Sequence, residues 1–172
     1  MHMTLANERS ILATEIGIRQ FQPGDAPAFR RLNEEWITRY FRIEPKEEIV
    51  LNDPQKAILD SGGRIFFATA GERCVGCCGL IRLNEKEFEV AKMAVDPSFQ
   101  GAGIGRRLLQ AVIDEARSAG AHRLYLETNH VLTPAICLYE SLGFMHIDPS
   151  RIIYPALPKL AAGHQTGELF HQ

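Results

Sequence analysis

The chain has 172 residues, of which 45% are hydrophobic and 23% are charged. This length fits one domain and is too short for two, and the apolar fraction is enough to build a buried core. Lys and Arg number 19 and Asp and Glu number 21, which gives a formal net charge of −2. The chain therefore lacks the broad positive field that binds nucleic acid or an anionic membrane, although a local basic patch could still hold a small anion.

The cysteines argue against both a disulfide scaffold and a metal site. Cys74, Cys77 and Cys78 crowd into one apolar stretch, and Cys137 lies far along the chain. Because no further ligands follow at zinc-site spacing, we expect no metal and read these three cysteines as small buried hydrophobes. The first ten residues lack a secretory pattern, and no run approaches ~18 apolar residues. We therefore expect a cytoplasmic protein.

The N-terminal part predicts one strand followed by helices. The strand covers residues 15–21, and the next helix runs from about residue 25 to a stop before Pro45. Apolar residues of this helix recur at helical spacing, at Phe29, Leu32, Trp36 and Tyr40. Shorter helices are predicted over residues 46–52 and from residue 53 to the glycine pair at 62–63.

The remainder predicts a strand meander and then alternating helices and strands. Short turns between strands indicate an antiparallel meander. Its strands cover 64–70, 74–83 and 88–95. Helices are then predicted over 103–119 and 133–142, and strands over 122–128, 144–147 and 152–157. The fold class is therefore α/β (α+β), a mixed sheet with helices on its faces. We expect one domain over residues 13–158, with tails at 1–12 and 159–172.

The most specific local feature is a glycine-rich loop that joins the strand at 88–95 to the helix at 103–119. It reads Gln100, Gly101, Ala102, Gly103, Ile104, Gly105 and Arg106. Glycines allow a close approach to the backbone, and a helix N-terminus supplies unpaired N–H donors, so the loop suits a phosphate or pyrophosphate group. A dinucleotide fingerprint fails because position 106 is Arg, and the Gly-Lys-Ser/Thr of a P-loop is absent.

This loop resembles the acetyl-coenzyme A signature of the GCN5-related N-acetyltransferase (GNAT) superfamily, Arg/Gln-x-x-Gly-x-Gly/Ala, over residues 100–105. A second signature follows at the expected interval. It comprises Tyr-Leu-Glu-Thr-Asn at 125–129 and the run from 135 to 144 that ends Leu-Tyr-Glu-Ser-Leu-Gly-Phe. The order of elements also matches, and the resemblance is least specific before residue 60.

The resemblance implies transfer of an acetyl group from acetyl-coenzyme A to a primary amine of a small molecule or amino acid. It implies a mostly antiparallel sheet that splays open between the strands at 88–95 and 122–128, with helices on both faces. The pantetheine would pair with the backbone of Met93, Ala94 and Val95, and the pyrophosphate would bind the N–H groups of residues 101–106. Gln100 and Asn129 would also contact the cofactor.

The same resemblance assigns the chemical roles. Ideal alternation places Glu89, Ala91, Met93 and Val95 on one face of the strand. Glu89 matches a general base of some family members and would need a raised pKa. Glu127 or a relaying water is an open alternative. A backbone N–H near residues 93–95 would stabilise the oxyanion. Tyr139 matches the tyrosine that protonates the leaving thiolate.

Several alternatives remain open at this level. A coenzyme-A-binding sensor or partner-binding module could use the same fold without catalysis, because fold does not guarantee activity. A protein or peptide N-acetyltransferase is a third reading, and dimers are common in this superfamily, so a homodimer is open too. Glu34 or Glu35 could hold the acceptor amine. Arg39 or Arg42 could pair with an acceptor carboxylate.

Overall fold

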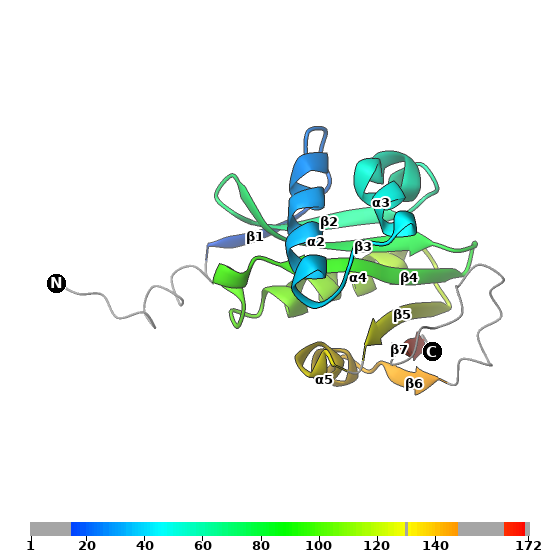
Figure 1. Cartoon of the computed structure of the whole chain (residues 1–172). Helices are drawn as coiled ribbons and strands as arrows, with labels where there is room; N and C mark the ends of the chain where they lie inside the picture. The colour runs from blue at the N-terminus through cyan, green and yellow to red at the C-terminus, as the bar shows by residue number, and fades with distance from the viewer. Residues whose placement is uncertain (1–14, 130, 148–163, 171–172) are drawn as a thin grey trace.

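The computed structural model describes residues 15–129, 131–147 and 164–170. Within them, seven strands form one sheet in the order β1-β2-β3-β4-β5-β7-β6 (Figure 1). The strands are β1 (Ile16–Gln20), β2 (Arg64–Ala70), β3 (Arg73–Arg82), β4 (Glu87–Val95), β5 (Arg123–Asn129), β6 (Met145–Ile147) and β7 (His164–Phe170). The helices are α2 (Ala26–Tyr40), α3 (Pro45–Asn52), α4 (Ile104–Ser118) and α5 (Thr133–Ser141), with a π-helical turn η1 (Gln55–Leu59) and a 3-10 turn η2 (Pro97–Phe99).

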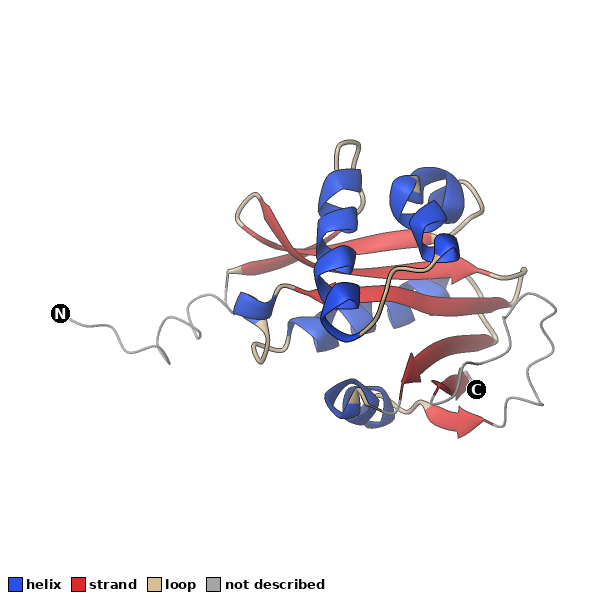
Figure 2. Cartoon of the chain, in the orientation of Figure 1, coloured by secondary structure: helices blue, strands red, loops and turns tan. Residues whose placement is uncertain are grey.

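The predicted architecture is confirmed. Every neighbouring pair of strands is antiparallel except β4 and β5, which are parallel. Figure 2 shows α2 and α3 on one face of the sheet and α4 on the other. The strand expected over residues 152–157 lies outside the described residues. No helix in the described parts of the chain is long and apolar enough to cross a membrane.

The expectation of a C-terminal tail over residues 159–172 is wrong for residues 164–170. This segment is β7, which pairs with β5 from Asn129 opposite His164 to Arg123 opposite Phe170, and also pairs with β6. The segment is short and polar, so its own propensity is weak. The unpaired edge of β5 supplies a hydrogen-bonding partner, and buried Leu169 joins the core.

Two apolar cores hold the layers together. One lies under α4, whose residues Ile104, Leu108 and Val112 are buried at intervals of four against the sheet. The other lies under α2, where Phe29 and Leu32 belong to one buried cluster with residues of β2, β3, β4 and η1. These helices fix the two faces of β4, the strand from which the site is built.

The sheet splays open where β4 and β5 separate. The parallel ladder runs only from Glu87 opposite Arg123 to Val90 opposite Leu126. Beyond Val90 the two strands diverge, so the edge of β4 from Ala91 onward no longer faces a paired β5. The splay expected between these strands is therefore confirmed.

Candidate active site

A β-bulge interrupts β4 at the start of the splay. Cys77 of β3 lies opposite Ala94, whereas Gly79 lies opposite Ala91, so β4 carries one extra residue in this interval. Lys92 has a φ of 55°, the only non-glycine residue of the described chain with a positive φ. Such a conformation costs about 1–2 kcal/mol, so neighbouring contacts must hold it.

Two buried side chains hold the bulge from the α2 side. The Cys77 thiol donates a hydrogen bond to the Lys92 carbonyl oxygen at 3.4 Å. The Asn33 amide of α2 donates to the Phe29 carbonyl oxygen at 2.9 Å and to Cys77 Sγ at 3.4 Å. Burial raises the pKa of Cys77 to about 12, so the thiol keeps its proton and can donate. Cys77 is therefore a hydrogen-bonding residue as well as a core residue.

The extra residue in the bulge exchanges the two faces of the sheet for the β4 side chains that follow it. Phe88 and Val90 pack in the core under α4, but Ala94 packs in the core under α2. Met93 contacts the α4 core instead. The prediction that Glu89 shares one face with Met93 and Val95 is therefore wrong, because the extra residue shifts the two-residue alternation.

Glu89 lies on the face that carries α3 and is half-buried. Burial is the main cause that raises its pKa to about 7, and the nearby charge of Glu127 on β5 raises it further. Lys92 and Lys46 lower it. Lys92 Nζ also lies 3.5 Å from Glu47 Oε1 of α3, which ties this helix to the bulge. A carboxylate with a pKa near 7 is suited to accept a proton at neutral pH.

Tyr139 projects from α5 and lines a small cavity between α5 and β5. Its neighbours there include Leu126, Ile136 and Phe144, and its ring meets the Phe144 ring edge-on with centroids 6.1 Å apart. Burial raises the pKa of Tyr139, and Cys78 raises it further, so the phenol stays protonated across the neutral range. The arrangement leaves Tyr139 as a hydrogen-bond donor.

The glycine loop presents backbone donors at the N-terminus of α4. Gly101 and Gly103 have φ angles of 79° and 76°, which turn the chain sharply into Ile104. Among the described residues, no carbonyl accepts a hydrogen bond from the N–H groups of residues 101–106. Arg106 is exposed and donates to Ser141 Oγ at 2.7 Å, which joins α4 to α5. This is an anion-binding arrangement of amides and positive charge.

Other residues singled out from the sequence have different neighbours. Asn129 Oδ1 accepts a hydrogen bond from Val131 N at 3.1 Å, so its side chain shapes the turn into α5. Gln100 Nε2 lies 3.5 Å from the Val95 carbonyl oxygen. Glu34 forms an ion pair with Arg30 at 2.6 Å, which occupies its carboxylate. In the parts of the chain that the structure describes, no group of three or more His, Cys, Asp or Glu could hold a metal.

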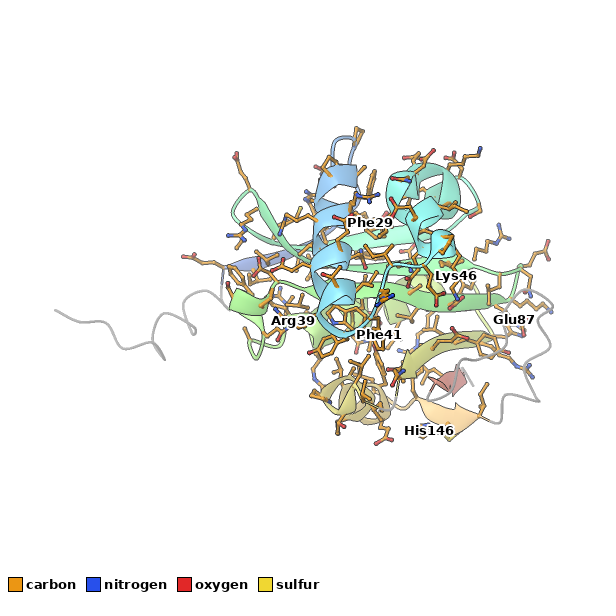
Figure 3. All side chains as sticks on the ribbon, viewed as in Figure 1. Phe29, Arg39, Phe41, Lys46, Glu87 and His146 are labelled. Atoms are coloured by element: carbon orange, nitrogen blue, oxygen red, sulfur yellow. The ribbon has the colours of Figure 1, made fainter. Side chains whose placement is uncertain are left out.

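Aromatic and basic side chains gather at the C-terminal end of α2. The Trp36, Tyr40 and Phe41 rings have centroids 5.6–6.2 Å apart. Tyr40 is 49% exposed, so this group extends from the core to the surface. Figure 3 places Arg39 and Phe41 at this end of the helix, and Arg39 is exposed. No signal in the amino-acid sequence predicts the roles of Asn33 and Lys92, because these roles depend on tertiary contacts.

Replacing Gly103 with Ala is expected to lower the affinity for coenzyme A about tenfold, because a φ of 76° strains any residue with a Cβ by about 1–2 kcal/mol. Isothermal titration measures the change. Gly24→Ala is the matched control: Gly24 has a φ of 97° in a turn before α2, and an added Cβ meets no atom within 4 Å at either glycine. An equal loss of affinity in both variants would contradict a specific role for the loop.

Comparison with known proteins agrees with this geometry. The model of the Acetyltransferase (GNAT) family matches residues 28–144. The [ribosomal protein bS18]-alanine N-acetyltransferase of Salmonella typhimurium is 43% identical over 112 residues, which cover 59% of this chain and 73% of that protein. The chain belongs to the GNAT acetyltransferase family, and the resemblance is confirmed.

Solved structures show the same fold. An acetyltransferase from Streptococcus agalactiae matches with a TM-score of 0.81 and 18% identity over 91% of this chain and 99% of that one. A GNAT family acetyltransferase from Elizabethkingia anophelis, solved with acetyl-CoA bound, matches with a TM-score of 0.60 and 23% identity over 91% and 99% of the two chains.

Two further relatives are matched over only part of their length. The chain spans 25% of an uncharacterized protein of Mycobacterium leprae, at 40% identity over 92 residues that cover 52% of this chain. It spans 55% of the N-alpha-acetyltransferase RimI of Mycobacterium tuberculosis, at 40% identity over 90 residues that cover 51% of this chain.

Proposed function

We propose that the chain transfers the acetyl group of acetyl-coenzyme A to a primary amine. The observation that carries this proposal is the order of groups along β4. The half-buried Glu89 precedes the splay, an unpaired strand edge follows from Ala91, and the amides of residues 101–106 lie beyond its end. One extended acyl donor could therefore place its thioester near the base, its middle along the strand edge and its pyrophosphate at the amides.

Acetyl-coenzyme A fits this arrangement from end to end. Its pantetheine amides pair with the backbone of Met93, Ala94 and Val95 as an added strand would. Its pyrophosphate accepts hydrogen bonds from the loop amides between Gly101 and Arg106. The relative from Elizabethkingia anophelis, which has the same fold, was solved with this ligand. Gln100, which follows the turn η2, and Asn129, the last residue of β5, remain proposed cofactor contacts.

The transfer is direct. The amine nitrogen attacks the thioester carbonyl carbon, and the proton it loses goes to Glu89, either directly or through a water. A backbone N–H at residues 93–95, beside the bulge, stabilises the oxyanion of the tetrahedral intermediate. The carbon–sulfur bond then breaks, and Tyr139 donates to the leaving thiolate. The products are the acetylated amine and coenzyme A.

The proposed acceptor is a small amine or an amino acid. Arg39 supports this choice, because it is exposed at the end of α2 and forms no ion pair with the described residues. A guanidinium in that position suits an acceptor carboxylate. Glu34 no longer fits as an acceptor ligand because Arg30 holds it.

A second candidate acceptor is the N-terminal amine of a protein. It is favoured by the similarity to the [ribosomal protein bS18]-alanine N-acetyltransferase. A peptide N-terminus and a free amino acid share the reacting α-amine but differ at the carboxyl end, where Arg39 would act. The two candidates therefore differ in how much activity depends on Arg39.

The test is thiol release from acetyl-coenzyme A with matched acceptors. One set holds amino acids and small amines, and the other holds short peptides with free or blocked N-termini. We expect turnover with the first set and a rise in the acceptor KM for Arg39→Met. Turnover with free peptides alone would establish the second candidate. Tight coenzyme A binding without thiol release for any amine would support the non-catalytic sensor.

A further inference from the structure

Asp96 is a buried carboxylate between β4 and the glycine loop. Asp96 is only 4% exposed, and Asn33 is the other polar residue of the described chain that is buried to this degree. Its Oδ1 accepts a hydrogen bond from Ser98 N at 2.9 Å, which caps the 3-10 turn η2. The Asp96 carbonyl oxygen accepts from Phe99 N at 2.9 Å. One residue thus sets how the chain leaves β4 and enters the loop.

Two arginines from different elements face the same carboxylate. Arg73 Nη2 of β3 donates to Asp96 Oδ2 at 2.7 Å. Arg31 Nη1 of α2 lies 3.9 Å from the same oxygen, and its Nη2 donates to the Cys74 carbonyl oxygen at 2.8 Å. The main-chain N–H of Asp96 donates to Val75 at 2.8 Å. The carboxylate is therefore anchored to β3 and, through Arg31, to α2.

This placement has an electrostatic consequence for an anionic ligand. A carboxylate so close in sequence to an amide-lined anion site would repel a phosphate group. Arg73 and Arg31 offset that repulsion. Both arginines lie nearest to Oδ2, whereas the Ser98 N–H donates to Oδ1, so the compensation and the cap act on different oxygens.

We infer that Asp96 is a positioning residue for the pyrophosphate of the acyl donor: its cap on Ser98 fixes the direction of the loop amides, and Arg73 with Arg31 compensates its charge. This inference rests on the proposed function. Loss of one partner of a buried ion pair also lowers stability, so the effect on stability alone cannot identify this role. The inference also requires that the effect of Asp96 depends on whether the donor carries a pyrophosphate.

Two substitutions at Asp96 separate the cap from the charge. Asp96→Asn retains an oxygen that can accept from Ser98 N but removes the negative charge. Asp96→Ala removes both. We expect Asp96→Ala to raise the Kd for coenzyme A and the KM for acetyl-coenzyme A about tenfold, the scale of one charge-assisted hydrogen bond. We expect Asp96→Asn to stay within about threefold of the wild type, because the cap remains.

The discriminating measurement uses S-acetylpantetheine, a donor without the pyrophosphate. Its kcat/KM should be unchanged in Asp96→Ala, whereas kcat/KM for acetyl-coenzyme A falls about tenfold. Asp25→Asn is the matched control. Asp25 also accepts from a backbone N–H, of Gln22, and pairs with an arginine, Arg19, but these contacts hold β1 and the turn before α2. Asp25→Asn should leave kcat/KM unchanged for both acetyl donors.

Equal losses with both donors would overturn the inference, because they indicate a general defect of the fold. Wild-type affinity in Asp96→Ala, or an Asp96→Asn variant as weak as Asp96→Ala, would overturn it too. If Asp96→Ala does not fold, Arg73→Met tests the charge at a side chain that is 61% exposed. We expect it to raise the KM for acetyl-coenzyme A alone, and an unchanged KM would contradict the inference. A wild type that does not bind coenzyme A would instead refute the proposed function.

Discussion

Replacing Glu89 with Gln is expected to lower kcat/KM for acetyl transfer about 100-fold, the scale at which a positioned general base contributes. The amide cannot take the proton of the attacking amine, yet it has the size of the carboxylate, so the packing on this face of β4 is retained. Steady-state thiol release measures the loss. Coenzyme A affinity should change little, because the proposed cofactor contacts begin after the bulge at Lys92.

The pH profile tests the same assignment. Because the pKa of Glu89 lies at about 7 and the base form is the active one, log kcat/KM should rise with pH up to about 7 and then level off. Ionisation of the acceptor amine adds a limb common to all variants. The Glu89→Gln variant should lack only the limb near 7. A limb that persists unchanged in this variant would contradict the role of Glu89.

Substitutions of its neighbours should move this limb in opposite directions. Glu127 raises the pKa of Glu89, so Glu127→Gln should shift the limb to lower pH while activity above neutrality is retained. Lys92 lowers that pKa, so Lys92→Met should shift the limb to higher pH. If Glu127 is the base instead, Glu127→Gln abolishes the activity and Glu89→Gln shifts the limb.

The stability of the protein offers a readout without substrate. Because the pKa of Glu89 is raised above its unfolded value, the folded state binds more protons than the unfolded state between pH 4.5 and about 7. The contribution of Glu89 to stability is therefore present below this window and is lost as pH rises through it. The unfolding free energy of Glu89→Gln should fall less over the same window, as measured by urea denaturation.

The sequence predicts those parts of the fold that local periodicity determines. The alternating meander, the amphipathic α4 and the glycine stops locate most elements to within two residues of their observed bounds. Glycines at 101 and 103 also identify the loop, because they adopt the positive φ that the turn requires. These features depend on neighbours in the chain, so one sequence is enough to find them.

Features that depend on tertiary contacts cannot be predicted from local sequence patterns. The bulge depends on Cys77 of β3, which bonds the Lys92 carbonyl oxygen, and on Asn33 of α2, which bonds Cys77. Nothing around Lys92 in the sequence indicates a positive φ. The strand β7 depends on the open edge of β5, so its polar segment resembles a tail. The pKa of Glu89 depends on burial and on Glu127 from another strand. In each case the decisive partner lies fifteen or more positions away in the sequence.

Replacing Tyr139 with Phe is expected to lower kcat about 100-fold while leaving coenzyme A affinity unchanged, because only the phenolic hydroxyl is lost and the ring keeps its edge-on contact with Phe144. The hydroxyl is the proposed proton donor to a thiolate whose conjugate thiol has a pKa of ~8.5. The defect should therefore shrink for a thioester whose leaving thiol is more acidic, since that thiolate departs without a proton.

Tyr125→Phe is the matched control for this substitution. Its hydroxyl lies 3.3 Å from Glu87 Oε1 near the start of β5, away from the cavity that Tyr139 lines. We expect that variant to keep the wild-type kcat with either thioester. A Tyr139→Phe defect that is equally large for acidic and ordinary leaving thiols would assign Tyr139 to positioning the donor. An unchanged kcat would exclude Tyr139 as the acid. The burial that raises the pKa of this phenol would then reflect packing of the ring alone.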